Sequence, residues 1–283
     1  MMKTTTRSDY KSRIARVTDA IMREPTSMRT VEEWAALANF SPFHFHRIYR
    51  AMQGECVSDT IRRARLTRAA LQLSTTDRRV IDIALEAGYE SAQSFARAFR
   101  SFVAASPSEF RAGHRTVADF IAPIVIERKD EIMNVDIIER EPTRAHVLQH
   151  RGPIASIPES WANLWRWHVQ AGLGGRSLYP IGVCFGDPET SGGFRYYAGL
   201  VFPDGVAASG EVETLDVPGG RYASYRHIGP YAGIGGAFQK LYGQWLPSSG
   251  YEPDDRPSLE VYRNTPYDTP PEALITDLLV PVK

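Results

Sequence analysis

Cysteine is scarce in this chain, and long apolar runs are absent. Cys56 and Cys184 are its only cysteines, and neither has a cysteine or histidine nearby at metal-ligand spacing. We therefore expect two reduced thiols, and no metal or other cofactor. No run of about 18 apolar residues occurs, which argues against a membrane-spanning helix. Residues 1–8 lack the apolar segment of a secretion signal, so we expect a cytoplasmic protein.

Net charge is also lacking, because 33 Lys and Arg residues balance 33 Asp and Glu residues. The balance hides an asymmetry along the chain. Residues 1–115 carry 19 basic and 12 acidic side chains, whereas residues 116–283 carry 14 and 21. A basic half favours a polyanionic partner such as nucleic acid, and the acidic half suggests something else.

The basic half contains a helical unit that occurs twice. In the first copy, Thr30 and Glu33 have the spacing of a capping box at the start of a helix. Asn39 suits a turn, and Ser41 and Pro42 then begin a second helix as its N-cap and first residue. The second copy follows 50 residues later, with Gly88 at the turn and these matches: Ser41/Ser91, Phe45/Phe95, Arg47/Arg97, Tyr49/Phe99 and Arg50/Arg100.

Each unit is a helix, a tight turn and a second helix, which is the plan of a helix-turn-helix, and residues 59–75 between the units read as one long basic helix. Several polar side chains project from the second helices: His44, His46, Arg47, Gln93 and Arg97. Arginine and glutamine read guanine and adenine edges, and Arg50 and Arg100 are placed to meet phosphates. His44 and His46 are two residues apart, so they cannot chelate a metal as an i, i+4 pair would. Arginine-rich helices are often only solvated, but two copies of the pattern in a basic segment favour DNA binding.

The same residues carry a family resemblance. The segments FSPFHFHRIYRAMQGE and IALEAGYESAQSFARAFRSF, with the later SPSEFR, resemble the DNA-binding domain of AraC-type regulators over about residues 8–113. The resemblance implies an all-α domain with two helix-turn-helix units, each placing its second helix in a major groove of double-stranded DNA. It assigns base contacts to these residues: Phe43, His44, His46 and Arg47 in the first unit, and Ala92, Gln93, Ala96 and Arg97 in the second. Ala92 and Ala96 offer no hydrogen bonds, although they can touch a thymine methyl group. RNA polymerase is a further partner to consider for such a regulator.

The acidic half carries a longer duplication. RAHVLQHRGPI, from Arg144, matches RYASYRHIGPY, from Arg221, and the offset of 77 continues through these pairs: His150/His227, Gly152/Gly229, Pro153/Pro230, Leu164/Leu241 and Pro180/Pro257. Each copy reads as strand, Gly-Pro turn, helix, strand and strand. We therefore predict two domains: an all-α domain at residues 1–115, a linker at 116–131, and an α+β domain of two pseudo-twofold halves at 132–283. Recurrence of the histidine before Gly-Pro in both copies favours a scaffold role for it.

Glu260 lies in the middle of SLEVY, residues 258–262, which alternates as a strand does. Leu259 and Val261 share one face, and Glu260 lies on the other. The offset of 77 pairs Glu260 with Val183, so the scaffold accepts an apolar residue at that position. Glu260 is either a solvated residue on an exposed strand or a charge that meets a ligand.

Aromatic residues concentrate in the same half, which holds four of the five tryptophans. Trp161 and Trp165 are four residues apart, so they share a helix face. A carboxylate among aromatic rings suits a cation, although a tryptophan stripe is as readily explained as core.

The segments YRHIGPY, GYEPDDRPSLEVYRN and EALITDLLVPV resemble GyrI-like effector-binding domains, which are related to the drug-binding domains of multidrug-responsive regulators. The resemblance implies that Glu260 is the acidic residue of a pocket and that Trp165, Tyr197 and Tyr231 are aromatic walls. With Trp161, these residues form our predicted ligand site.

Our leading hypothesis is a transcription regulator that binds promoter DNA and responds to a lipophilic, cationic small molecule; it is not an enzyme. Two alternatives stay open. A GyrI-like hydrolase would use Glu260 and Tyr197 in acid and base roles on a reactive drug-like molecule. A sequestrant would hold such a molecule, or another protein, in the same groove. No Ser-His-Asp arrangement supports the enzyme.

Overall fold

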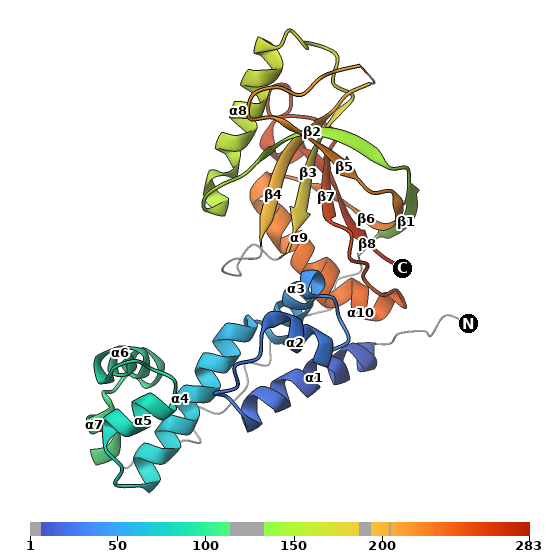
Figure 1. Cartoon of the computed structure of the whole chain (residues 1–283). Coiled ribbons are helices and arrows are strands. Elements are labelled where there is room, and N and C mark those ends of the chain that lie inside the picture. The colour runs from blue at the N-terminus through green and yellow to red at the C-terminus, as the bar shows by residue number, and fades with distance from the viewer. Residues whose placement is uncertain (1–6, 114–132, 187–193, 204) are drawn as a thin grey trace. The chain divides into compact units, whose positions relative to one another are not determined.

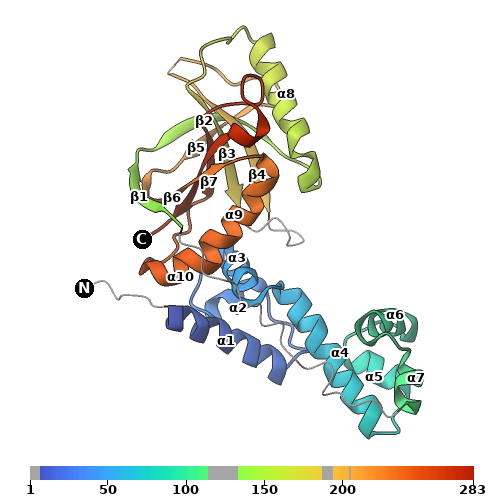
Figure 2. The same cartoon turned by 180° about the vertical axis from the view of Figure 1, so that it is seen from behind.

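The computed structural model describes residues 7–113, 133–186, 194–203 and 205–283 (Figures 1 and 2). The predicted linker, residues 116–131, lies outside these ranges. The described residues form two compact units. One unit contains residues 11–39 and 52–113, and the other contains residues 7–10, 40–51 and those from 133 onward.

The N-terminal part is helical, as predicted. Its helices are α1 (Arg7–Arg23), α2 (Val31–Leu37), α3 (Pro42–Gln53), α4 (Val57–Thr75), α5 (Val80–Glu86), α6 (Ala92–Val103) and α7 (Pro107–Ala112). Helices α3 and α6 have the same length and lie 50 residues apart, which confirms the repeat.

Local chemistry explains where these helices begin and end. Thr30 caps α2, and Glu33 completes the predicted capping box by accepting from the Thr30 N–H at 2.7 Å. Asn39 and Gly88 adopt left-handed conformations, with φ of 52° and 83°, so both turns have the conformation that the sequence predicts. Helix α3 then begins at Pro42, and Ser91 caps α6 by accepting from the Ser94 N–H at 3.2 Å.

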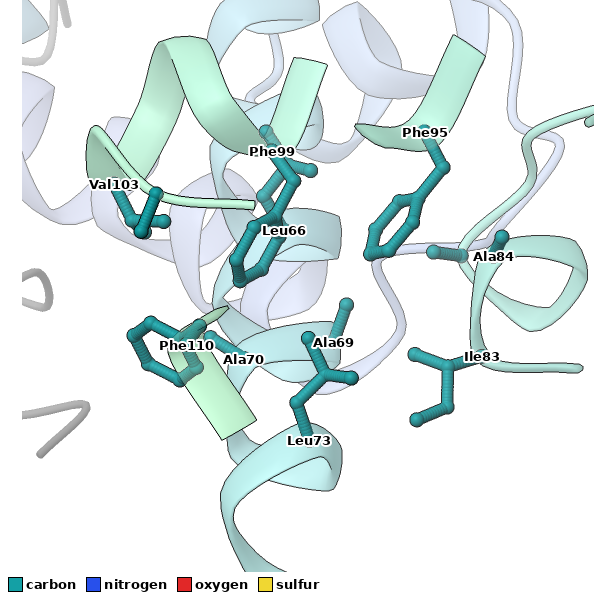
Figure 3. Close-up of a cluster of buried hydrophobic side chains, with 12 residues drawn as sticks. Leu66, Ala69, Ala70, Leu73, Ile83, Ala84, Phe95, Phe99, Val103 and Phe110 are labelled. Atoms are coloured by element: carbon teal, nitrogen blue, oxygen red, sulfur yellow. The ribbon is translucent and has the colours of Figure 1, made fainter. Parts of the chain in front are cut away.

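The second helix-turn-helix has its own apolar core (Figure 3). Phe95 and Phe99 of α6 pack with Leu66 of α4, Ile83 of α5 and Phe110 of α7, and all five side chains are almost fully buried. The ring centroids of Phe99 and Phe110 lie 5.4 Å apart in an edge-on arrangement. The other face of α6 is exposed at Gln93, Arg97 and Arg100.

The C-terminal part contains a fully antiparallel eight-stranded sheet among the described residues. Its strands are β1 (Val135–Arg140), β2 (Thr143–Gln149), β3 (Tyr179–Phe185), β4 (Arg195–Val201), β5 (Glu213–Val217), β6 (Gly220–Ile228), β7 (Ser258–Tyr262) and β8 (Ile275–Pro281). The strand order is β1-β6-β8-β7-β3-β4-β2-β5.

This order is symmetric about its centre, so that β3 matches β7, β4 matches β8, β2 matches β6 and β5 matches β1. One half contains β1 to β4 and the other contains β5 to β8. Strand β1 pairs with β6 and strand β5 pairs with β2, so each half adds an edge strand to the other. The duplication therefore folds as predicted, as two α+β halves with pseudo-twofold symmetry.

Each half places a helical segment on the sheet. The first half has η2 (Ile154–Ser156) followed by α8 (Ile157–Gln170). The second half has η3 (Tyr231–Gly233), α9 (Ile234–Lys240), the π-helical turn η4 (Leu241–Trp245) and α10 (Leu246–Ser249), and η5 (Pro271–Ala273) precedes β8. Both segments pack on the same face of the sheet. Trp161 of α8 forms a hydrogen bond with Tyr196 of β4, and Tyr242 of η4 forms one with Ser258 of β7.

The opposite face of the sheet has its own core. Ile181 and Val183 of β3 lie there with Leu259 and Val261 of β7 and with Tyr197 of β4. Every residue of β7 is buried, because both faces of this central strand are covered.

Candidate functional site

The two central strands place Gly182 opposite Glu260. Beside this pair, Ile181 faces Val261 and Val183 faces Leu259. The neighbouring ladders show which residues of the two halves correspond. In the first half Val147 pairs with Gly199, which pairs with Ile181, and in the second half Ser224 pairs with Leu279, which pairs with Leu259. Because Val147 and Ser224 are equivalent, Ile181 corresponds to Leu259 and Gly182 to Glu260, which is an offset of 78. The sequence-based match of Glu260 with Val183 was therefore wrong by one residue. One extra residue between α9 and β7 causes the difference, and in a strand a one-residue slip moves a side chain to the other face.

Glu260 is buried, with 8% of its surface exposed, on the face that α8 and α9 cover. Tyr196 Oη donates a hydrogen bond to Glu260 Oε2 at 3.1 Å, and Tyr262 Oη donates to the same oxygen. The Cys184 thiol donates to Oε1 at 3.6 Å. Trp161 Nε1 donates to Tyr196 Oη at 3.0 Å and so fixes the phenol in place. The strand position was predicted correctly, and the solvated alternative for Glu260 does not hold.

Burial dominates the electrostatics of this cluster. Loss of solvation raises the pKa of Glu260 above its ordinary value, although the hydrogen bonds from Tyr262, Tyr196 and Cys184 and the charge of Arg47 oppose the rise. Burial and the nearby carboxylate also raise the pKa of Cys184, Tyr196 and Tyr262 well above their ordinary values. These three groups are therefore neutral donors, and the carboxylate is the one group of this cluster suited to bind a cation.

A cavity of about 870 Å³ opens above this cluster. The helical segments of the two halves line it with the same seven positions, at an offset of 77: Ile154/Tyr231, Ala155/Ala232, Ile157/Ile234, Pro158/Gly235, Trp161/Phe238, Ala162/Gln239 and Trp165/Tyr242. Cys184, Tyr196, Glu260 and Tyr262 line it from the sheet. The cavity therefore lies across the pseudo-twofold axis, with aromatic walls on both sides and a carboxylate beside the axis.

The structure brings most of the predicted ligand residues together. Trp161, Trp165 and Tyr231 line the cavity with Glu260. Tyr197 is not brought to this group, because it lies on the opposite face of the sheet, where it pairs with Val183. Its neighbour Tyr196 contacts Glu260 instead.

Sequence reasoning missed Tyr196, Tyr262 and Cys184 as members of the site. The alternation of a strand places the adjacent residues Tyr196 and Tyr197 on opposite faces, but it does not say which face bears the site. The sequence therefore offered no reason to choose Tyr196. Tyr262 did carry one, because it lies two residues from Glu260 and shares its strand face.

Three of the predicted DNA contacts on α6 lie on one exposed surface. Gln93, Arg97 and Arg100 are exposed, and their spacing of four and three residues aligns them along the helix. Ala92 and Ala96 are partly buried. This surface is opposite to the buried Phe95 and Phe99, which hold α6 in its domain.

Helix α3, except for its last two residues, belongs to the same compact unit as the sheet. His44 is buried there: its Nδ1 lies 3.0 Å from Tyr242 Oη, and its Nε2 contacts the Asp254 carbonyl. Burial lowers the pKa of His44 to about 4, so this ring is neutral near pH 7. Arg47 donates to the Gly186 carbonyl at 2.8 Å and to Ser258 Oγ at 3.3 Å.

Arg47 and Arg50 also line the cavity, so a ligand there meets two side chains that the sequence assigns to DNA. His46 is partly buried on the same helix. Phe43 lies in α3, but its side chain is outside the described part of the structure.

The recurrent histidines have the scaffold contacts that their repetition predicts. His150 Nε2 lies 3.1 Å from the Pro153 carbonyl, and His227 Nε2 lies 3.2 Å from the Pro230 carbonyl. In each half the ring spans a Gly-Pro turn. The glycines at these turns, Gly152 and Gly229, have φ of 138° and 130°.

No cluster of three or more His, Cys, Asp or Glu side chains that could hold a metal occurs in the described ranges. Within the same ranges, no helix combines the length and apolar character needed to cross a membrane.

Comparison with known proteins agrees with this organisation. Residues 133–283 match the GyrI-like small molecule binding domain, and residues 34–113 match a helix-turn-helix domain. SoxS of Escherichia coli strain K12 is 38% identical over 77 residues, which are 27% of this chain and 72% of SoxS. The transcriptional activator AarP of Providencia stuartii is 36% identical over 86 residues, which are 30% of this chain and 64% of AarP.

Two solved structures resemble the C-terminal part. The EcmrR C-terminal domain is 18% identical, has a TM-score of 0.45, and covers 54% of this chain and 99% of its own. SAV2435, solved with tetraphenylphosphonium, is 16% identical, has a TM-score of 0.43, and covers 53% of this chain and 94% of its own.

Proposed function

We propose that this protein is a DNA-binding regulator controlled by a lipophilic cation. The premise is its family: the chain belongs to the AraC-type transcription regulators with a C-terminal GyrI-like small molecule binding domain. A helix-turn-helix domain implies DNA binding, and a GyrI-like domain implies a small-molecule ligand. The identity of the ligand, contact with RNA polymerase and a cytoplasmic location are further parts of the proposal.

The observation that carries the cation is the buried Glu260. An ionised carboxylate is costly to bury, and its neighbours Tyr196 and Tyr262 are neutral donors. A cation bound in the cavity would add opposite charge next to this carboxylate, beyond what Arg47 contributes. Trp161, Trp165 and Phe238 would present ring faces and edges to its apolar groups. Because equivalent walls flank the axis, the ligand should carry apolar groups on both sides of its charge.

A matched pair of probes tests this ligand class. Tetraphenylphosphonium carries a charge, and triphenylphosphine oxide is neutral and also carries phenyl groups. By calorimetry, the protein should bind the cation, and Glu260→Gln should weaken that binding roughly tenfold or more while the neutral probe is unaffected. Equal affinity of wild type and variant for the cation would remove Glu260 from the site.

Footprinting tests the DNA-binding part of the proposal. Two helix-turn-helix units should protect about two helical turns of DNA, with an affinity that falls steeply as salt rises. A bound ligand should change the affinity for DNA, and DNA should change the affinity for ligand by the same factor. Absence of sequence-preferring binding would contradict the regulator.

The hydrolase alternative depends on the same carboxylate. Cys184, Tyr196 and Tyr262 are poor nucleophiles because their pKa values are raised, so a hydrolase would need Glu260 to activate water as a general base. Turnover of a bound electrophile that is lost in Glu260→Gln would favour this alternative. Ligand binding without any DNA binding would favour the sequestrant.

A further inference from the structure

Gly182 lies in the middle of β3, where glycine needs a reason. Its φ is not positive, so the backbone conformation there is open to any residue. A glycine inside a strand contributes no side-chain packing and lowers the stability of the strand relative to alanine. Neither turn geometry nor strand propensity explains this residue.

Space around Gly182 provides the reason. A Cβ atom there would lie 2.7 Å from Tyr196 Oη, 2.8 Å from Glu260 Oε2 and 3.2 Å from Glu260 Cβ. The first two distances are shorter than non-bonded contacts of real Cβ atoms, so the phenol or the carboxylate would have to move. The hydrogen bond between those two groups occupies the volume that a side chain at Gly182 would fill.

The pseudo-twofold axis explains why this happens at Gly182. Gly182 and Glu260 correspond to each other and also face each other across β3 and β7. Two equivalent side chains on one face at the axis compete for a single space. A carboxylate from the second half therefore requires the first half to contribute no side chain.

We propose that Gly182 is a positioning residue for the ligand carboxylate: its missing side chain lets Glu260 lie beside the axis and accept the hydrogen bond of Tyr196. This inference rests on the proposed cation-binding function of the cavity. Gly182 acts on the ligand only indirectly, because it determines where in the cavity the negative charge of Glu260 is placed.

The test compares Gly182→Ala with Gly199→Ala. Gly199 lies in neighbouring β4 and is also crowded, since a Cβ there would lie 3.0 Å from Val147 Cγ1, but it faces the opposite core. Affinity for tetraphenylphosphonium is measured by calorimetry across pH, with triphenylphosphine oxide as the neutral probe and thermal unfolding as the check on folding. Gly182→Ala should bind the cation roughly tenfold more weakly, bind the neutral probe normally, and show a higher midpoint pH for cation binding. Gly199→Ala should bind both probes as wild type does.

The same substitution is then made in the Glu260→Gln protein, where it should have no further effect on cation affinity. Normal cation affinity of Gly182→Ala would overturn the inference, and so would an equal loss for both probes or an equal loss in the Glu260→Gln background. If wild type itself bound no cation, or bound it independently of Glu260, the proposed function would fail first. Should Gly182→Ala not fold, the comparison is made in a Tyr196→Phe background, which lacks the Tyr196 Oη atom nearest to the added Cβ. In that background Gly182→Ala should again weaken cation binding roughly tenfold relative to Tyr196→Phe alone. Equal affinity of the two proteins would overturn the inference.

Discussion

The indole N–H of Trp161 donates a hydrogen bond to Tyr196 Oη at 3.0 Å, and Tyr196 Oη donates in turn to Glu260 Oε2. A residue of α8 thus orients a residue of β4, which in turn holds the carboxylate of β7. The Glu260 carboxylate is therefore held in place by side chains from both the helical layer and the sheet.

This chain predicts that Trp161→Phe weakens cation binding while most of the aromatic wall remains. Loss of one neutral hydrogen bond should reduce affinity about threefold to tenfold. Trp167→Phe is the control, since Trp167 Nε1 donates to Ser209 Oγ and Trp167 is not part of the cavity wall. Calorimetry with tetraphenylphosphonium measures both variants, and a loss in Trp167→Phe equal to that in Trp161→Phe would contradict the role of the bond.

Adjacent tyrosines on opposite faces provide a second comparison. Tyr196→Phe removes the phenol that bonds Glu260, so cation affinity should fall severalfold. Tyr197→Phe alters the core on the other face and should leave affinity unchanged. Competition binding of a fluorescent lipophilic cation measures both. The reverse result would place Tyr197, and not Tyr196, in the ligand site.

Stability should depend on pH through Glu260. Because its pKa is raised by burial, the folded protein keeps this proton to a higher pH than the unfolded chain, whose pKa is near 4.5. The stabilising contribution of the protonated group is thus complete below pH 4.5 and is lost as pH rises through the folded-state pKa. Glu260→Gln should therefore unfold at a temperature closer to that of wild type at pH 4, and be increasingly more stable than wild type as pH approaches 8. A difference in Tm that does not change with pH would show that the carboxyl group titrates alike in both states.

Arg97 should contribute to sequence-specific DNA binding. It is exposed on α6 in line with Gln93, so Arg97→Ala should cost about 1–3 kcal/mol of affinity for the footprinted site. Arg16 is also exposed but lies on α1, outside both predicted reading helices, and Arg16→Ala should have a much smaller effect. Electrophoretic mobility shifts with specific and random DNA measure both variants. Equal losses on both DNAs would assign Arg97 to phosphate contact.

The duplicated histidines should differ in their contribution to stability. His150 is buried and lies 2.8 Å from Ser160 Oγ through its second nitrogen, so His150→Ala should cost about 1–3 kcal/mol. His227 is partly exposed, so His227→Ala should cost less. Denaturant unfolding measures the two free energies, and equal costs would show that the turn contact, and not burial, sets the contribution.

Much of the fold followed from local patterns. The capping box at Thr30, the turns at Asn39 and Gly88 and the strand from Ser258 to Tyr262 were all predicted, because each depends on interactions within a few residues. The two duplications predicted the double helix-turn-helix and the symmetric sheet, because similar sequences fold alike. The burial of His44 had no such signal, since its partners Tyr242 and Asp254 are about 200 residues away in the sequence.

The sequence by itself determined the helical units, the duplicated α+β halves and a carboxylate on one face of a central strand. Tertiary structure decided which side chains meet that carboxylate. Strand register made Gly182, and not Val183, the counterpart of Glu260, and it turned Tyr196 toward the cavity and Tyr197 away. Register depends on pairing between distant strands, and a shift of one residue reverses the face of every side chain, so a count along the chain could not fix it.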